Sequence, residues 1–436
     1  MVGNGHPQRG AGFLFIWIDA TNPGSRLRIF GMTLLERQLH TIIEAGLDPN
    51  EVYVQLSSET ANLPLLLPPD LLRQLSVRWG HERRTVSEYR TTLSQAGQDK
   101  TLDEPLDEPL LALEADAVVD SRLLRHLGER SGSWAARGEA GETQTAVLRF
   151  EGADSLPPST GVRLPELAER SLQAGRLQEV VLAEVQSYIR KLRRDLPVYL
   201  FRILDNASRD RAERFLFWSN YKGSTDFFTK YVYPPLVWRA VRPLARWRVH
   251  PNVISVFNVF ITFLAVPLFA YGYWISAFTL AYTMSVLDSV DGKLARLTFT
   301  ASKLGDILDH GLDIVHPPVW YFAWAWALSG GIPGAPVFQL AVWMAVFYVL
   351  DRIVAALFSA RIGQSIHGCT SLDERMRTFI SRRNINVPLF MLGLLLGIPI
   401  PVFVAIVVWQ VASLGFHTLR LVQFWNRKHL LGTLES

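Results

Sequence analysis

Hydrophobic positions divide the chain into two parts of different character. Up to about residue 205, apolar residues come in short runs between polar turns, as in the strands and amphipathic helices of a soluble domain. From residue 251 onward the apolar runs are longer, and most are near the roughly 20 residues that a membrane-crossing helix needs. Six runs occur, at about residues 252–271, 274–290, 305–328, 336–359, 386–400 and 401–425. The pattern predicts an α/β soluble domain followed by an all-α six-span transmembrane helix bundle.

The soluble part begins with the order of elements that is typical of an α/β unit. The apolar residues 13–18 predict a buried strand, and Asn22-Pro23-Gly24 predicts a turn after it. An amphipathic helix ending at Gly46 and a second strand at Val52–Leu56 are predicted next. Strand, loop, helix and strand in this order indicate a parallel sheet.

The rest of the soluble part predicts loops and helices. The repeated Leu-Asp-Glu-Pro after Lys100 and the run Gly138–Thr143 predict surface loops. Residues 176–194 have the helical period and a basic end, which predict an amphipathic helix. Another helix is predicted to start after Asn206-Ala207-Ser208 and to end near Tyr221.

Charge predicts how the apolar runs are oriented. Residues 226–248 mix aromatic rings with arginines, as in a helix lying on an anionic membrane surface. Loops between the apolar runs alternate between basic and uncharged, and the N-terminus shows no signal-peptide pattern. By the positive-inside rule both termini are expected in the cytoplasm. We expect a multi-pass protein of the cytoplasmic (inner) membrane.

Composition limits the class of protein further. Lys and Arg number 44 against 40 Asp and Glu, so no nucleic-acid partner is implied. The single cysteine, Cys369, excludes an internal disulfide and any cysteine-based zinc site. The expected organisation is a soluble domain, a linker with a juxtamembrane helix, a membrane domain and a cytoplasmic tail, at residues 1–205, 206–250, 251–427 and 428–436.

Acidic residues of the membrane part concentrate in one stretch. Five of the nine that follow Asn252 lie between Asp288 and Asp313. Asp288 and Asp291 are spaced i, i+3, and Asp309 and Asp313 are spaced i, i+4, so each pair shares one face of a helix. Carboxylates at membrane depth are costly and repel one another unless a cation lies among them. This all-oxygen set predicts a site for Mg²⁺ or Mn²⁺.

The order D-x-x-D-G-x-x-A-R-x(8)-G-x-x-x-D-x-x-x-D, from Asp288 to Asp313, resembles the signature of the CDP-alcohol phosphotransferase family. The resemblance covers about residues 222–427. It implies transfer of a substituted phosphate group from a CDP-alcohol to an acceptor hydroxyl, with release of CMP. It also implies that the metal is bound by Asp288, Asp291, Asp309 and Asp313 and that Asp313 is the general base. The implied CDP-binding residues are Asn252, Gly292, Ala295, Arg296 and Gly305.

The acceptor side is predicted from cationic residues near the ends of the apolar runs. Arg352 and Arg361 are the candidates for binding an acceptor phosphate. Topology alone explains Arg377, Arg382 and Arg383 equally well, and His310 and His316 are interpreted as bundle residues. The expected partners are a CDP-alcohol such as CDP-diacylglycerol or CDP-inositol, a small or lipid alcohol acceptor and the bilayer. The resemblance is compatible with a homodimer.

The soluble part is similar to sugar-nucleotide cytidylyltransferases, as in proteins that fuse such a domain to a phosphotransferase. In that family a glycine-rich loop grips the nucleoside triphosphate and an aspartate, here Asp116, holds Mg²⁺. Only Gly24-Ser25-Arg26-Leu27 remains of the loop, and the Lys-Pro element is missing. Without that lysine no cation faces the reacting phosphorus. We therefore expect a degenerate domain, with a bifunctional enzyme and a non-catalytic membrane scaffold as the alternatives.

Overall fold

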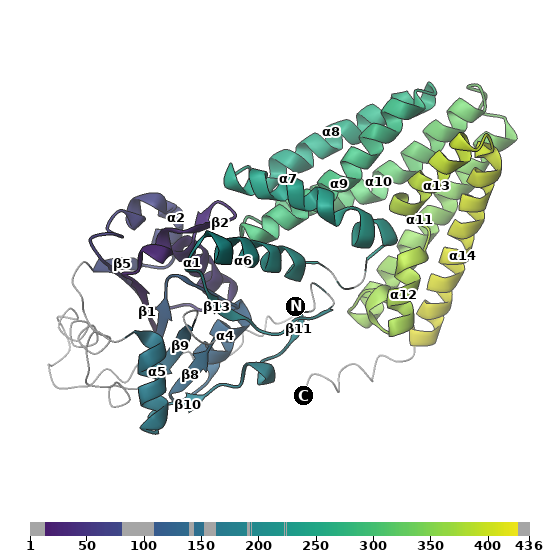
Figure 1. The fold of residues 1–436 in the computed structure, drawn as a ribbon. Coiled ribbons are helices and arrows are strands. Elements are labelled where there is room, and N and C mark those ends of the chain that lie inside the picture. Colours follow the sequence, from purple (N-terminus) through teal and green to yellow (C-terminus); the bar gives the residue numbers. More distant parts are fainter. Residues whose placement is uncertain are drawn as a thin grey trace, which may run out of the picture. The chain divides into compact units, whose positions relative to one another are not determined.

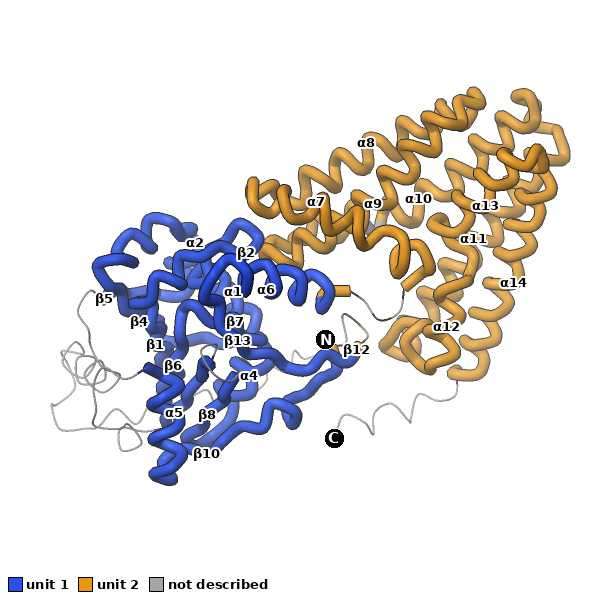
Figure 2. Tube along the Cα trace, in the orientation of Figure 1, with its two compact units in different colours: residues 1–188, 195–219 blue, residues 189–194, 220–436 orange. Residues whose placement is uncertain are grey.

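The computed structural model describes the chain from Leu14 to Trp425, except for residues 81–108, 139–143, 152–162, 190, 191, 193, 222 and 224. The side chains of Asp309 and His310 are likewise outside the described part. Figure 1 shows the helices and strands. The chain divides into two compact units, residues 1–188 with 195–219, and residues 189–194 with 220–436, which Figure 2 distinguishes by colour. The predicted Leu-Asp-Glu-Pro loop and most of the predicted loop at 138–143 lie outside the described residues.

The first unit is built on a seven-stranded sheet with the order β10-β8-β9-β6-β1-β4-β5. Its strands are β1 (Phe15–Ala20), β4 (Glu51–Leu56), β5 (Val77–Gly80), β6 (Leu110–Glu114), β8 (Trp134–Arg137), β9 (Ala146–Phe150) and β10 (Gln178–Glu179). Strand β1 pairs in parallel with both β4 and β6. The predicted parallel α/β arrangement is therefore confirmed.

Side chains alternate across this sheet and form a core on each face. On β1, Ile16 and Ile18 belong to one hydrophobic cluster and Trp17 to another. The first cluster includes residues of α1 (Leu34–Glu44), α2 (Pro69–Gln74) and α4 (Ser121–Glu129), and the second includes residues of α5 (Leu164–Gln173). Helix α1 begins with a capping box between Thr33 and Glu36, which explains why it starts at that point.

Two short pairings and one further helix complete the unit. Strand β2 (Arg28–Ile29) pairs with β3 (Met32–Thr33), and β7 (Ala117–Val119) pairs with β13 (Leu200–Arg202), both antiparallel. Helix α6 (Asn206–Ser219) lies where the sequence predicts a helix.

The amphipathic helix predicted at residues 176–194 is wrong. This segment contains β10, a 3₁₀ turn at Leu182–Glu184, and the strands β11 (Tyr188–Ile189) and β12 (Arg194–Asp195). Val180 donates its backbone N–H to Ala135 O at 2.8 Å, and the side chains of Val180 and Val185 are buried in the core. Pairing with the sheet edge and burial of β-branched residues therefore outweigh the helical period of the sequence.

The second unit consists of helices. A π-helical turn (Phe228–Val232) and α7 (Pro234–Arg246) occupy the predicted juxtamembrane stretch. Helices α8 (Pro251–Ala270), α9 (Trp274–Leu297), α10 (Lys303–Leu328), α11 (Pro336–Ile362), α12 (Ser371–Phe379), α13 (Arg383–Leu395) and α14 (Pro399–Trp425) follow. Aromatic rings fill their shared core, where Trp324 stacks on Phe390 with ring centroids 4.2 Å apart.

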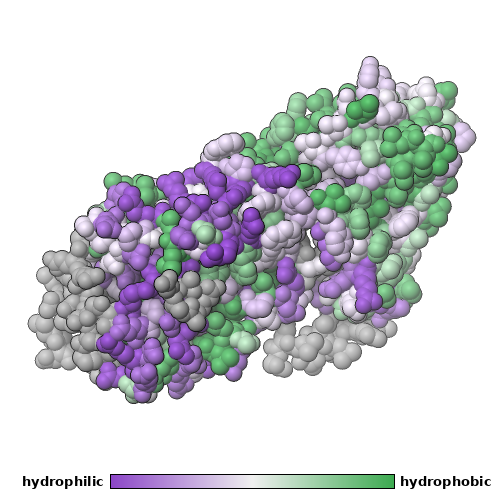
Figure 3. Space-filling model, viewed as in Figure 1, coloured by the Kyte–Doolittle hydropathy of each residue, from purple (hydrophilic) through white to green (hydrophobic). Residues whose placement is uncertain are grey.

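Three helices of the described residues, α8, α11 and α14, are long and apolar enough to cross a membrane. Figure 3 shows hydrophobic residues gathered on the surface of this unit, in agreement with such an environment. Helices α9, α10 and α13 lie at the other three predicted spans. Because α9 and α10 carry the acidic cluster and α13 has 13 residues, the count of six spans stays a prediction.

Candidate functional site

Two consecutive helices carry the acidic residues of the sequence motif. Asp288 and Asp291 lie one turn apart on α9, and Asp309 and Asp313 lie one turn apart on α10. Helix α8 packs against both. The position of the Asp309 side chain is outside the described part, so its relation to the other three carboxylates stays a prediction.

A cavity of about 400 Å³ lies at the ends of α8, α9 and α10. All five residues that the sequence predicts for CDP binding line it, together with Asp291. Its full lining is Leu192, Pro251, Asn252, Ser255, Asp291, Gly292, Ala295, Arg296, Thr300, Ala301, Ser302, Gly305 and Asp306. The cavity has the size of a site for a small ligand.

Hydrogen bonds between helix ends hold this cavity in shape. Ser302 is the N-cap of α10, and its hydroxyl accepts from the Gly305 N–H at 3.0 Å and donates to Asn252 Oδ1 at 2.8 Å. A side chain at position 305 would place its Cβ 3.2 Å from Asn252 Oδ1, which is tighter than an ordinary contact. A small residue at this position therefore favours the close approach of α8 and α10.

Asp291 is fixed at the wall of the cavity. Its carboxylate accepts from Ser255 Oγ at 2.7 Å and from the Gly292 N–H at 2.6 Å, and it is 6% exposed. Hydrogen bonds to both carboxylate oxygens therefore restrict the orientation of this side chain.

A second, smaller pocket of about 80 Å³ contains Asp313. It is lined by Asp313, Pro317, Tyr348, Arg352, Ser381, Arg382, Arg383 and Asn384. The Arg383 guanidinium donates to Asp288 Oδ2 at 3.0 Å and to Asp313 Oδ1 at 3.1 Å, so it joins α9 to α10. His316 Nε2 lies 3.1 Å from the same guanidinium, inside the bundle. Three guanidinium groups around one small space form a site suited to an anion.

The backbone of Asp313 has an unusual partner. Pro317 follows it by four residues and has no N–H, so the Asp313 carbonyl lacks its helical donor. The Tyr348 hydroxyl donates to this carbonyl at 2.7 Å. Helix α11 thereby holds the segment of α10 that carries the predicted base.

The two arginines predicted for the acceptor lie in different places. Arg352 lines the small pocket, as expected. Arg361 is not among its lining residues, and its guanidinium lies 5.3 Å from the Trp425 ring. Arg382 and Arg383 line the small pocket in its place, although positive-inside topology explained these two residues equally well. Two successive arginines at the start of α13 are the sequence feature that could have indicated this site.

The donor chemistry around Asp288, Asp291 and Asp313 is compatible with a hard divalent cation, because all three offer carboxylate oxygens. Among the side chains that the structure describes, no three from His, Cys, Asp and Glu gather closely enough to hold a metal. That set does not include Asp309. Arg383 supplies positive charge between Asp288 and Asp313, so these two acids do face a cation.

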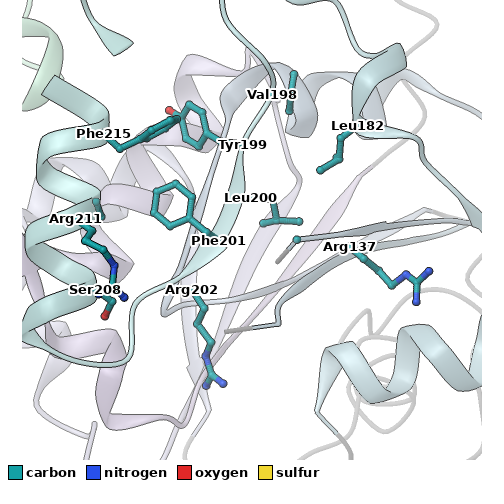
Figure 4. Close-up of a pocket in the computed structure, with 12 residues that line it drawn as sticks. Arg137, Leu182, Val198, Tyr199, Leu200, Phe201, Arg202, Ser208, Arg211 and Phe215 are labelled. Atoms are coloured by element: carbon teal, nitrogen blue, oxygen red, sulfur yellow. The ribbon is translucent and has the colours of Figure 1, made fainter. Parts of the chain in front are cut away.

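The first unit contains a cavity of about 450 Å³ near β13 and α6, shown in Figure 4. The rings of Tyr199, Phe201 and Phe215 contact one another on one side of it. Arg202 points away from these rings, and its Nε donates to Asp116 Oδ2 at 2.6 Å. Both partners are almost completely buried, with side chains 4% and 1% exposed.

The expected magnesium ligand of the first unit is therefore already paired. Burial raises the pKa of the Asp116 carboxyl above its ordinary value, and the Arg202 guanidinium opposes this shift. Glu114 nearby accepts from Thr145 Oγ1 at 2.8 Å and pairs with Arg163 at 3.0 Å. A metal ion bound through Oδ2 of Asp116 would have to compete with a buried guanidinium.

Comparison with known proteins shows what the helical part is similar to. Residues 248–417 match the family model described as CDP-alcohol phosphatidyltransferase. This family domain indicates a transferase of substituted phosphate groups, as the sequence motif predicts. A curated relative is an uncharacterized CDP-alcohol phosphatidyltransferase class-I family protein of Schizosaccharomyces pombe (strain 972), 29% identical over 112 residues. The match covers 22% of this chain and 29% of that protein, so the chain spans less than a third of the relative's length.

Solved structures similar to the chain include two nucleotidyltransferases. One is 4-diphosphocytidyl-2C-methyl-D-erythritol synthase from Anaerococcus prevotii, at 12% identity and a TM-score of 0.32, covering 47% of this chain and 96% of that one. The other is a putative glucose-1-phosphate thymidylyltransferase from Bacillus anthracis, at 8% identity and a TM-score of 0.31, covering 46% of this chain and 94% of that one.

Proposed function

We propose that this chain is an integral membrane CDP-alcohol phosphotransferase that transfers a substituted phosphate group to an acceptor hydroxyl and releases CMP. The observation that carries the proposal is the 400 Å³ cavity, in which Asn252, Gly292, Ala295, Arg296 and Gly305 come together beside Asp291. These residues are distributed over more than fifty positions of sequence, yet they line one space. The match of residues 248–417 to the family supports the same activity.

In this proposal the two pockets have different substrates. The larger cavity binds the cytidine and pyrophosphate of the donor, and Arg296 in its wall contributes positive charge near the phosphates. The smaller pocket binds the acceptor, and Arg352, Arg382 and Arg383 hold a phosphate or another anionic group on it. Asp313 accepts the proton of the attacking hydroxyl.

The aspartates of the motif bind Mg²⁺ or Mn²⁺ in this proposal. Asp288, Asp291, Asp309 and Asp313 would hold the ion, which supplies charge stabilisation for the pyrophosphate and the leaving CMP. Six membrane spans, both termini in the cytoplasm and a role in phospholipid or inositol-phosphodiester synthesis complete the proposal.

The experiment that tests this function follows CMP release. The purified full-length chain is incubated with CDP-diacylglycerol or CDP-inositol, Mg²⁺ and candidate acceptors such as glycerol 3-phosphate and inositol phosphate. We expect CMP release that requires an acceptor and is lost with a chelator. A chain that releases no CMP from any donor and acceptor pair in Mg²⁺ or Mn²⁺ contradicts the proposal, and leaves the non-catalytic scaffold.

The first unit is expected to be inactive as a cytidylyltransferase. Arg202 donates a hydrogen bond to the Asp116 carboxylate. The remnant of the glycine-rich loop, Pro23–Arg26, forms a 3₁₀ turn in which Arg26 is the only cationic residue. With CTP, an alcohol phosphate and Mg²⁺, the full-length chain should therefore release no pyrophosphate above background. Pyrophosphate release in step with CDP-alcohol formation would instead support the bifunctional enzyme.

A further inference from the structure

One face of α14 holds the connection between α11 and α13. Trp409 Nε1 donates to Phe379 O at 2.8 Å, and the Ser381 N–H donates to Ser413 Oγ at 2.9 Å. About two turns further along α14, Arg420 donates to Asp373 Oδ2 at 2.7 Å. These α14 residues and His417 are spaced by three or four positions, so they form a single stripe along the helix.

His417 reaches from this stripe toward the small pocket. It is completely buried, and its Nδ1 donates to Asp351 Oδ1 at 2.5 Å. The other oxygen of Asp351 accepts from the Arg352 guanidinium at 2.8 Å. Arg352 lines the pocket that contains Asp313. A continuous chain of hydrogen bonds therefore leads from α14 through α11 to a cationic group of the pocket.

The same stripe supports a second arginine of the pocket. His367 Nε2 lies 3.5 Å from the Arg382 guanidinium, and the His367 ring contacts the His417 ring at 5.0 Å between centroids. Ser381, held by Ser413, directly precedes Arg382 in the chain. Two of the three arginines in the pocket are thus located by contacts that begin on α14.

Asp351 needs both of its partners. Its side chain is 1% exposed, and a buried carboxylate with an unsatisfied oxygen is costly. With His417 on one oxygen and Arg352 on the other, both the carboxylate and the guanidinium are restricted to one orientation. Without His417, the free oxygen would compete for the guanidinium and draw it away from the pocket.

We propose that His417, acting through Asp351, is a positioning residue that aims Arg352 at an anionic group in the small pocket. The proposal rests on the proposed function only in assigning that group to the acceptor. The anion site itself is inferred from the three arginines that line the small pocket. The chemistry recognised is a phosphate-like anion, whether on a soluble ester or on a lipid headgroup.

The test measures anion binding by full-length protein purified in detergent. Inorganic phosphate is titrated calorimetrically into the wild type and into His417→Leu, and binding by the variant should be about tenfold weaker or more, as for a lost charge-assisted hydrogen bond. His417→Asn, whose amide can donate from the place of Nδ1, should restore most of the affinity. Phosphatidic acid in mixed micelles, compared with glycerol 3-phosphate, then separates the lipid from the soluble source.

Two controls separate positioning from general damage to the fold. Gln410→Leu replaces another buried polar residue of α14 that lines neither pocket, and it should bind phosphate like the wild type. The double variant Asp351→Asn, His417→Leu should bind phosphate no more weakly than the weaker of the two single variants, because the two residues act as one unit. In the transfer assay His417→Leu should raise the acceptor KM and leave kcat and the donor KM within about twofold.

Several outcomes overturn the inference. A wild type that binds no phosphate would do so, as would His417→Leu with unchanged affinity or Gln410→Leu with an equal loss. If only the proposed function is wrong, no CMP is released, but phosphate binding still depends on His417.

Discussion

Replacing Asp313 with Asn is expected to abolish transfer while donor binding persists. Asp313 lies in the small pocket and is absent from the lining of the larger cavity, so the change removes a proton acceptor and leaves Asp288, Asp291 and Asp309 as the main metal ligands. Its side chain is 54% exposed, which leaves it accessible to an acceptor hydroxyl. Losing a general base is expected to slow transfer by about 10²–10⁴-fold.

The measurement compares the rate of CMP release with the affinity for the CDP-alcohol. Glu374→Gln, at an exposed carboxylate of α12 that lines neither pocket, is the matched control and should transfer at the wild-type rate. Near-normal turnover by Asp313→Asn would remove Asp313 from the role of base. Loss of donor binding in the same variant would instead make it mainly a metal ligand.

Replacing Asp291 with Ala is expected to remove both donor binding and transfer. The Asp291 carboxylate is the one described member of the motif's acids that lines the larger cavity and is held by Ser255 and the Gly292 backbone. A metal ligand at this place contributes several kcal/mol of charge stabilisation, so donor affinity in Mg²⁺ should fall roughly 10²-fold or more.

Titration of the CDP-alcohol with and without a chelator measures this loss. Ser255→Ala is the graded control, because it keeps the carboxylate and removes one hydrogen bond, and it should weaken donor binding by no more than about tenfold. If Asp291→Ala binds the donor with unchanged, Mg²⁺-dependent affinity, the assignment of Asp291 to the metal is wrong.

Features that depend on neighbouring residues were predicted from the sequence, and features that depend on contacts with distant residues were not. Helical spacing placed each pair of aspartates on one helix face, whereas the five nucleotide residues were implied by the resemblance to the family. The structure brings these five residues into one cavity. Residues 176–194 were misread because helical period says nothing about the free edge of β8, with which this segment pairs. From sequence alone Arg361 was preferred to Arg383 for the acceptor, whereas the structure places Arg383, and not Arg361, at the small pocket. Lysines and arginines at the cytoplasmic end of a span look alike whether they set topology or bind an anion.

The hydrogen bond between Tyr348 and the Asp313 carbonyl also has a consequence for how related chains vary. Proline at position 317 creates the need for a donor, and the hydroxyl at position 348 meets it. Where another residue replaces this proline, its own N–H satisfies the carbonyl, and phenylalanine would serve at position 348. We therefore expect positions 317 and 348 to covary among homologues, with the loss of the hydroxyl tolerated only in chains that have already lost the proline.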